Sequence, residues 1–503
     1  MREMKSALLF LLFVTIALAG FGPNVRIDHQ HQSRYSCCHC AIAVGPGAPP
    51  NQPLYVVFEG DTFGRDDVWF QRSLDGGRTW LPADVLIRRG DRYAFYPDIT
   101  TDSDGNVYIV YTDEYIDTVG ARIYHISCVR SSDGGTTWSA PARVDDKPKG
   151  STGWARVAVD SAGKLICAWN DGRTGSMHIW SSVSTDRGAT WSQNVRADDD
   201  TTDHGCYHAD VSVQPGTNHY LVTAQAPRWV GSHVKMCAYL YRSTDMGQTF
   251  QPGVQLDTFN QYVGRPHVVA DRDHVICDYS GNGLSVRDTI IVESRTFYTR
   301  ADTWGAPSRV TDLDALRRLY VSDALALSGD GRVHTALMVC DTADWRYDVF
   351  YTSSSDHGVS WSDIELVNDD TTGSNWYPDI GADMAGYAYL VWTGAGGIWF
   401  STNNPAAISE LPVQPTGEAK ARVVSRYDGV EVEYQLPAAA RVRATLHDAL
   451  GRQVGALDID IQEPGTHRLS WNQDREGRKL ASGAYFVLLD IGKEKARLKA
   501  VVR

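Results

Sequence analysis

The stretch SLDGGRTW at residues 73–80 decides the fold, because the same eight-residue pattern returns four more times along the chain. The other copies are SSDGGTTW at 131–138, STDRGATW at 184–191, STDMGQTF at 243–250 and SSDHGVSW at 354–361. Recurrence at a regular period is the sequence signature of a repeat architecture, in which each repeat is one supersecondary unit. The fold then depends on the length of the full repeat.

The repeat extends upstream of the eight-residue motif. YPDITTDSDGNVYIVYTDE at 96–114 matches YPDIGADMAGYAYLVWTGA at 377–395, and five further segments follow the same pattern. The first apolar residue of each segment lies 54 to 58 residues after the previous one. These seven anchors are Ile42, Ile99, Val157, Val211, Val268, Ala324 and Ile380.

Each unit contains short runs of alternating apolar residues separated by Gly and Asp turns. Such runs predict antiparallel β-strands, and four of them fit into one unit. Four-stranded units repeated radially form a β-propeller. We therefore expect an all-β protein with a seven-bladed propeller over residues 20–408, six blades being the alternative.

The last unit lacks a fourth strand after its third. NVRIDHQ at 24–30 resembles NVRADDD at 194–200, which is the fourth strand of its own unit. We expect the N-terminal strand at 24–28 to complete the last blade, because closure removes an exposed sheet edge.

The repeated motif also carries a family resemblance. The pattern S-x-D-x-G-x-T-W resembles the Asp-box, or BNR repeat, of sialidases and several other propellers. The resemblance implies a structural role on the periphery, away from the active site, for Asp75, Asp133, Asp186, Asp245 and Asp356. Side-chain chemistry agrees, since Asp can hold a turn by accepting backbone N–H bonds and Gly tolerates a positive φ.

Candidate ligand-binding residues follow from the repeat register. In a propeller, the loops that lead into the first strands help to build the mouth of the central funnel. Aromatic, imidazole and guanidinium groups there can stack on sugars and bind hydroxyls or carboxylates. The residues three positions before the anchors, with Arg156 added, give the predicted ligand-binding set His39, Tyr96, Trp154, Arg156, His208, Arg265 and Tyr377, while Val321 takes this position in the sixth unit.

A second ring lies directly before the anchors and contains four aspartates, Asp98, Asp210, Asp323 and Asp379. Two interpretations are open. The carboxylates can hydrogen-bond neighbouring blades, or they can line the mouth, where oxygen ligands could hold Ca²⁺. No other cofactor is expected.

The sialidase resemblance implies an arginine triad that grips the substrate carboxylate, a Tyr nucleophile activated by Glu, and an Asp acid/base. The family's first arginine sits in an Arg-Ile-Pro motif on the first inner strand. The most similar segment here is Arg26-Ile27-Asp28, but the repeat register places it on the outer closing strand. The sequence shows no third arginine to complete a triad with Arg156 and Arg265. We assign no catalytic residue and expect binding of carbohydrate or another surface ligand. A glycoside hydrolase acting on extracellular glycans is the alternative.

Charge and the N-terminal segment indicate an exported protein. The net charge is −13 and no basic stripe occurs, which argues against a nucleic-acid partner. Arg2 and Lys5 precede the apolar run ALLFLLFVTIALA, which ends in an A-x-A site, so residues 1–19 are predicted to be a signal peptide. No later segment has 18 consecutive apolar residues, so we expect a secreted or cell-surface protein without a transmembrane segment.

Nine cysteines are scattered along the chain and do not suggest a disulfide scaffold. The sequence CCHC places Cys37, Cys38 and Cys40 on the same predicted face as Cys206 and His208. Thiolates and imidazoles are Zn²⁺ ligands. However, adjacent cysteines cannot easily reach one ion and the two units lie apart around the ring, so we predict no metal site and favour free thiols or a local disulfide.

The C-terminal part of the chain has a different pattern. Pro412, Pro415 and Gly417 mark a linker at 409–418, and six short alternating segments over 419–503 predict a small Ig-like β-sandwich. LHDALGRQV at 446–454, GTHRLSWN at 465–472, LASGAYFVLL at 480–489 and KARLKAVVR at 495–503 resemble the C-terminal sorting domain of type IX secretion and the related flagellar-hook-capping module. The resemblance implies the type IX secretion machinery as a partner, and an extracellular glycan or surface protein is the expected ligand of the propeller.

Overall fold

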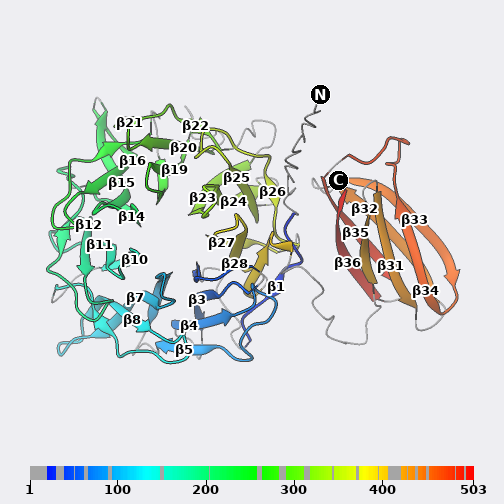
Figure 1. The fold of residues 1–503 in the computed structure, drawn as a ribbon, viewed down its shortest axis with the longest axis horizontal. Helices are drawn as coiled ribbons and strands as arrows, with labels where there is room; N and C mark the ends of the chain where they lie inside the picture. The colour runs from blue at the N-terminus through cyan, green and yellow to red at the C-terminus, as the bar shows by residue number, and fades with distance from the viewer. Residues whose placement is uncertain are drawn as a thin grey trace, which may run out of the picture.

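A computed structural model of the chain shows a ring of β-sheets and a β-sandwich (Figure 1). The residues that it describes are 20–29, 39–49, 51–61, 66–88, 93–147, 152–202, 204–230, 232–257, 263–282, 290–310, 318–341, 345–369, 373–394, 396–405, 421–426, 429–436, 440–448, 452–481, 483–491 and 494–502. The predicted signal peptide, the predicted linker, Cys37 and Cys38 therefore lie outside the described residues, as do the side chains of Val321 and Asp323. Among the described residues, no helix has the length and apolarity needed to cross a membrane.

The ring consists of seven antiparallel sheets, one for each repeat of the sequence. Blade 1 contains β2 (Cys40–Val44), β3 (Leu54–Asp61), β4 (Asp66–Ser73) and β5 (Val85–Arg88). Blade 2 contains β6 (Ala94–Thr101), β7 (Val107–Ile116), β8 (Arg122–Ser131) and β9 (Ala142–Arg143). Blade 3 contains β10 (Thr152–Val159), β11 (Leu165–Asp171), β12 (His178–Ser184) and β13 (Val195–Arg196). Blade 4 contains β14 (Tyr207–Val213), β15 (Tyr220–Val230), β16 (His233–Ser243) and β17 (Val254–Gln255).

In every blade the strands are given from the axis outward. Blade 5 contains β18 (Val263–Ala270), β19 (His274–Asn282), β20 (Ile290–Tyr298) and β21 (Thr303–Trp304), and β22 (Ser308–Arg309) also pairs with β20. Blade 6 contains β23 (Arg318–Leu327), β24 (Val333–Asp341), β25 (Arg346–Ser354) and β26 (Glu365–Leu366). Blade 7 contains β27 (Asn375–Ala382), β28 (Ala388–Gly394), β29 (Gly397–Thr402) and the N-terminal strand β1 (Val25–Arg26).

Strand β1 closes the ring, because it pairs with β29 and so joins the two ends of the repeat region in one sheet. Ile27, directly after β1, is fully buried and its N–H donates to the carbonyl of Ile398 at 2.9 Å. The inner strand of blade 7 in turn contacts that of blade 1. The hydrogen bonds of the closing strand thus satisfy the outer edge of β29.

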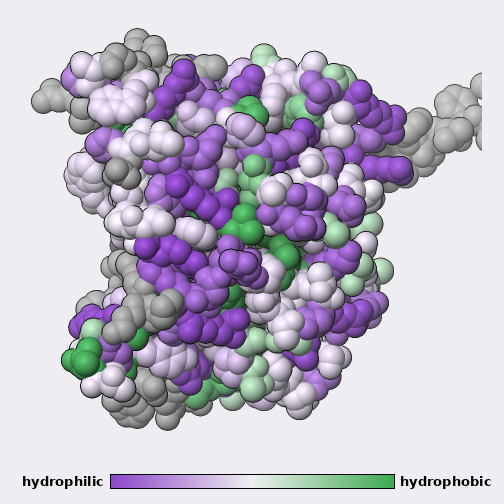
Figure 2. Space-filling view, turned by 90° about the vertical axis from the view of Figure 1, so that its left-hand side faces the viewer, coloured by the Kyte–Doolittle hydropathy of each residue, from purple (hydrophilic) through white to green (hydrophobic). Residues whose placement is uncertain are grey.

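The hydrophobic core lies between consecutive blades. One core cluster, for example, combines Ala43 and Tyr55 of blade 1 with Ile99 and Ile109 of blade 2. Figure 2 views the ring from the side of β11 and β12, where hydrophilic residues cover most of the surface with small hydrophobic areas between them. Packing of each sheet on its neighbours therefore supplies the burial that one blade alone cannot.

The Asp-box turns join the third and fourth strands of blades 1, 2, 3, 4 and 6. Asp75 accepts the backbone N–H of Thr79 at 2.8 Å and its hydroxyl at 2.6 Å. Matching bonds hold the other four turns, at Asp133, Asp186, Asp245 and Asp356. These carboxylates are fully used within their own turns.

Each Asp-box turn also rests on the preceding blade. The motif glycine of blade 2, Gly135, has a φ of 82°, and a Cβ there would lie 2.5 Å from Phe70 of blade 1. The half-buried ring of Trp138 packs edge-on against the same Phe70 at 5.0 Å. The motif therefore forms a packing contact with the preceding blade as well as a turn.

The C-terminal residues form two sheets around one core. One sheet has β30 (Ala421–Arg426), β31 (Gly429–Leu436) and β34 (Gly465–Trp471), and the other has β33 (Gln453–Gln462), β32 (Ala440–Asp448), β35 (Gly483–Ile491) and β36 (Glu494–Val502). A single buried cluster includes Tyr434 and Trp471 of the first sheet and Leu446 and Val487 of the second. This is a β-sandwich. The six strands expected here omitted β33, whose Gly and Asp residues weaken the strand pattern.

Candidate functional site

The predicted ligand-binding residues meet in one cavity on the ring axis. The cavity has a volume of about 330 Å³ and is lined by His39, Cys40, Tyr96, Pro97, Trp154, Ala155, Arg156, His208, Ala209, Arg265, Pro266, His267, Tyr377, Pro378 and Asp379. All seven residues of the predicted set are in this lining. These residues lie at the starts of the inner strands. The Asp-box turns follow the ends of the third strands. Because the third strand of a blade runs parallel to its inner strand, these turns lie at the opposite end of the blade from the cavity.

The side chains of the ring contact one another in blade order. His39 lies 4.4 Å from Tyr377 and 4.7 Å from Tyr96, measured between ring centroids. Trp154 continues the series, 5.1 Å from Tyr96 and 5.1 Å from His208, on whose imidazole it stacks. The Arg265 guanidinium lies 5.3 Å from the Tyr377 ring. Aromatic faces, imidazoles and guanidinium groups therefore surround the axis.

In five blades, a β-bulge at the start of the inner strand presents the ring side chain. In blade 2, Phe95 pairs with Thr112 but Asp98 pairs with Val110, so the inner strand contains one extra residue. Blades 3, 4, 5 and 7 have the same shift at the same repeat position. Bulges bend a strand and re-aim a side chain, and they tolerate the Pro that follows the bulged residue in three of these blades.

The bulged residues have an unusual backbone conformation. Their φ angles are 52° at Tyr96, 53° at Trp154, 54° at His208, 34° at Arg265 and 47° at Tyr377. A positive φ costs a large L-residue roughly 1–2 kcal/mol. Strained residues of this kind cluster at functional sites, where the surrounding structure fixes them. Five of them around one cavity make the axis the candidate functional site of the ring.

The second ring of aspartates fastens one blade to the next. Asp98 of blade 2 accepts the backbone N–H of Val157 in blade 3 at 2.8 Å. Asp210 of blade 4 binds Val268 of blade 5 at 2.9 Å, and Asp379 of blade 7 binds Ile42 of blade 1 at 2.7 Å. The first of the two interpretations, hydrogen bonding between blades, therefore describes these three residues.

Burial changes the proton affinity of groups around the cavity. Burial, with the nearby Asp98 carboxylate, raises the pKa of Asp379 to about 7. Burial also raises the pKa of Asp98 to about 6, against the opposing effect of Arg156, whose Nη1 lies 3.6 Å from Asp98 Oδ1. Burial and the Arg265 charge lower the pKa of His208 to about 4, so its imidazole is neutral at pH 7.

The Arg26-Ile27-Asp28 segment is not in the lining of the cavity, and it instead connects the closing strand to the third strand of blade 7. Arg26 pairs with Asp28 at 2.8 Å, and Asp28 accepts the N–H of Ile398 on the third strand of blade 7 at 2.7 Å. Arg143 and Asp145 repeat the arrangement in blade 2. In the described lining of the cavity, the arginines are Arg156 and Arg265.

Sequence reasoning did not single out Glu59, which lies behind the ring. Its carboxylate accepts the backbone N–H groups of His39, at 3.3 Å, and Tyr96, at 2.5 Å. It thus ties the bulge of blade 2 to blade 1. Glu59 is one charged residue at the end of a strand, and no sequence signal separates it from the other charged residues of the propeller loops.

Two clusters of metal-type ligands occur among the described residues, and neither was predicted. One combines His178, Asp200 and Cys206, all buried, and the other combines Asp271, His274 and His357. In the second cluster, the Asp271 carboxylate lies 3.0 Å from His274 Nδ1 and 3.6 Å from His357 Nδ1. Those contacts join blade 5 to blade 6.

One known sequence family matches the chain. A family described as a BNR repeat-like domain matches residues 51–252, a span that includes the first four Asp-box motifs. The chain thus contains a BNR repeat-like region. No curated protein matches the chain.

Several solved structures are similar at low identity. A protein of unknown function from Dyadobacter fermentans is 13% identical, with 77% of this chain and 99% of that chain covered and a TM-score of 0.44. The GH93 α-L-arabinofuranosidase of Fusarium graminearum in complex with arabinobiose is 13% identical, with 78% and 99% covered and a TM-score of 0.44. A mutant of the NanB sialidase from Streptococcus pneumoniae is 9% identical, with 75% and 94% covered and a TM-score of 0.41. Similarity at this level assigns no activity to the chain.

Proposed function

We propose that the protein binds the end of a glycan in the axial cavity, as a sialidase-like propeller that works outside the cell. The observation that supports this most directly is the ring of bulged residues. Tyr96, Trp154 and Tyr377 offer aromatic faces, and Arg265 offers donors for a hydroxyl or carboxylate. The cavity, at about 330 Å³, is at the small end of ligand pockets and suits one sugar unit.

A glycan array of sialylated and neutral sugars tests this proposal, followed by titration of the best ligand. Trp154→Ala removes the partly exposed ring of the series, and we expect about tenfold weaker binding, because such stacking is worth roughly 1–1.5 kcal/mol. Arg265→Ala should weaken an acidic ligand more than a neutral one.

Met384→Ala is the control, because this side chain is 72% exposed on the β27–β28 turn, at the opposite end of the strands from the cavity. An array without a single bound glycan would remove the support for carbohydrate binding. Equal affinity of Trp154→Ala and the unmodified protein would place the ligand elsewhere.

Glycoside hydrolysis is the second candidate function, and Asp379 is the observation that favours it. Asp379 is one of the lining residues of the cavity, and burial raises the pKa of its carboxyl to about 7, the property of a general acid. We expect a hydrolase to release the fluorophore from at least one member of a panel of sialosides and neutral glycosides, and Asp379→Asn to abolish release while leaving binding intact. The absence of turnover across the panel, with binding present, would leave the binding function alone.

The C-terminal β-sandwich is proposed to act in export or surface attachment through the type IX machinery. Support comes from the matching sequence segments, of which GTHRLSWN and LASGAYFVLL fall on β34 and at the start of β35. Fractionation of cells that express the chain with and without residues 419–503 would test it. We expect the full chain outside the cell, and equal export of both forms would contradict the proposal.

A further inference from the structure

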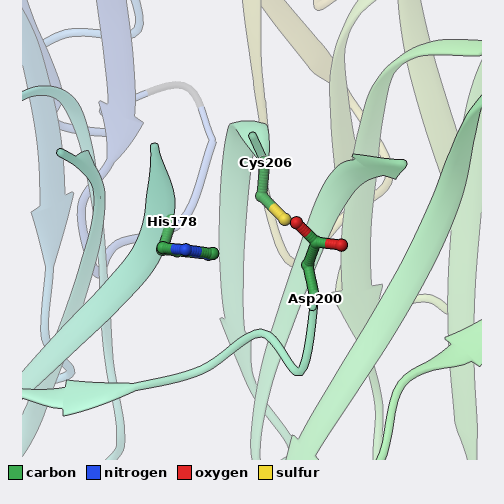
Figure 3. A group of neighbouring side chains, drawn as sticks. All are labelled: His178, Asp200 and Cys206. Carbon is green, nitrogen blue, oxygen red and sulfur yellow. The ribbon is translucent and has the colours of Figure 1, made fainter. Parts of the chain in front are cut away.

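We propose that His178, Asp200 and Cys206 form a zinc site at the junction of blades 3 and 4. One ligand atom from each residue lies within 4.8 Å of the other two. Figure 3 shows the three side chains converging from β12, from the loop after β13 and from the loop before β14. A tetrahedral ion with bonds of about 2.0–2.3 Å separates its ligands by roughly 3.3–3.8 Å, so small side-chain movements complete the site.

Asp200 carries a buried oxygen without a partner. The residue is 8% exposed, and its Oδ1 accepts the N–H of Thr202 at 2.8 Å, whereas its Oδ2 has no hydrogen-bond partner among the described residues. A buried carboxylate oxygen without a partner is costly. A cation beside His178 and Cys206 would supply that partner.

His178 is held in the orientation that a metal ligand needs. Its Nδ1 lies 3.0 Å from Asp198 Oδ1, which leaves Nε2 as the nitrogen to bind an ion. Asp198 is itself fixed, because its Oδ2 accepts the N–H of Ile179 at 2.6 Å. A carboxylate that fixes the second nitrogen of a ligating histidine is the usual support of a zinc site.

The preceding junction of blades shows that these ligands are not part of the propeller framework. His125 and Asp145 repeat the His178–Asp198 pair there, with Nδ1 and Oδ2 at 3.1 Å. The positions that correspond to Asp200 and Cys206 hold Lys147 and Thr152, which cannot complete a zinc site. The extra carboxylate and thiol therefore occur where the histidine is already oriented.

The donor set selects the metal. One imidazole, one thiol and one carboxylate suit Zn²⁺, whereas Ca²⁺ and Mg²⁺ require mainly oxygen ligands. Cys206 is fully buried, and burial together with Asp198 and Asp200 raises the pKa of its thiol, so zinc must displace the thiol proton. Three protein ligands leave a fourth position for water or another small donor.

The zinc site would influence the axial cavity because it fixes the segment that leads into β14. Cys206 precedes the bulged His208 by two residues, and its N–H donates to the carbonyl of Met177, next to His178, at 2.8 Å. Zinc bound by all three side chains fixes this entry into β14. The ion is therefore expected to stabilise the folded chain and the position of His208.

Titration of the purified, reduced full chain with Zn²⁺ and with Co²⁺ tests the proposal. We expect one ion per chain, a thiolate-to-cobalt charge-transfer band, and a thermal midpoint that rises with zinc. Cys206→Ala should abolish the band and the rise in midpoint. Asp200→Asn, which keeps the thiol, should weaken zinc binding by about tenfold or more.

Cys237→Ala is the matched control, because it removes another buried thiol, on β16 of blade 4, that is not part of the cluster, and it should keep the band. Absence of one-to-one binding, or a band that persists in Cys206→Ala, would overturn the proposal. If Cys206→Ala does not fold, the affinity of Asp200→Asn decides, and an unchanged affinity would count against the site.

Discussion

At the scale of single residues, the bulged ring combines a strained backbone with aromatic side chains that line the cavity. Trp154, with a φ of 53°, is 37% exposed and stacks on His208. A glycine would adopt this backbone without cost. Tryptophan at this position has an unfavourable backbone conformation and is only partly buried, so neither local conformation nor core packing explains its presence.

Replacement of Trp154 by glycine and by alanine separates these two effects. Both changes remove the indole, but alanine keeps the backbone penalty. We expect Trp154→Gly to be more stable than Trp154→Ala by about 0.5–1 kcal/mol in denaturant unfolding. At Ala158, further along the same strand, Ala→Gly should instead destabilise by about 0.5–1 kcal/mol. Equal stability of the two Trp154 variants would show that the backbone there is not strained.

Asp379 gives a pH dependence. Its carboxyl in the folded protein keeps its proton up to about pH 7, whereas the unfolded chain releases it near about pH 3.9. Between these values the folded state binds more protons, so the contribution of Asp379 to the free energy of unfolding falls as pH rises.

We therefore expect Asp379→Asn to reduce the fall in thermal midpoint between pH 4 and pH 7, because the amide can still accept the Ile42 N–H. Asp98→Asn should act in the same direction over a window that ends near pH 6. Superimposable pH profiles of Asp379→Asn and the unmodified chain would refute this account.

At the scale of the element, the Asp-box turn is a contact between blades. Its aspartate satisfies the turn internally, and its glycine lets the turn lie on the blade before it. At Gly247, for example, an added Cβ would lie 2.7 Å from Val183 of blade 3. The motif recurs because each blade needs this seam, and the cavity lies at the other ends of the strands.

Gly135→Ala and Gly120→Ala form a matched pair for this interpretation. Their φ angles are 82° and 83°, but a Cβ at Gly135 meets Phe70 at 2.5 Å whereas one at Gly120 meets nothing within 4 Å. Gly120→Ala should cost about 1 kcal/mol through the backbone alone, and Gly135→Ala at least about 2 kcal/mol. Chemical unfolding measures both, and equal losses would mean that the Phe70 contact relaxes freely.

At the scale of the whole molecule, stability depends on closure of the ring by its first strand. Residues 25–27 lie on the last blade, so the two ends of the repeat region belong to one sheet. Phe21 extends this contact, since its buried ring packs against Tyr351 of blade 6 at 4.9 Å.

Ile27→Ala tests the closing contact. Ile27 is fully buried, and its removal leaves a cavity at the seam, which should cost about 2–5 kcal/mol in unfolding free energy. Val25→Ala, on the same strand but only partly buried, should cost less. A loss at Ile27 no larger than that at Val25 would show that the ring is not held at this seam.

The repeat register alone determined the all-β fold, the order of the blades and the seven residues that share the cavity. It could do so because each of these properties depends on local periodicity, which fixes where every inner strand begins. Strand β33 was not predicted, because its Gly and Asp residues obscure the alternation of apolar and polar residues that marks a strand.

Only the tertiary structure decided how residues of different blades meet. The closeness of Asp200 and Cys206 to His178, the contact of Gly135 with Phe70, and the binding of Asp379 to Ile42 across the closure all depend on the rotation between neighbouring sheets. The positive φ of the bulged residues is likewise imposed from outside, because sequence propensity disfavours it at every one of them. A periodic pattern specifies each blade, but the packing of one blade on the next specifies the chemistry between them.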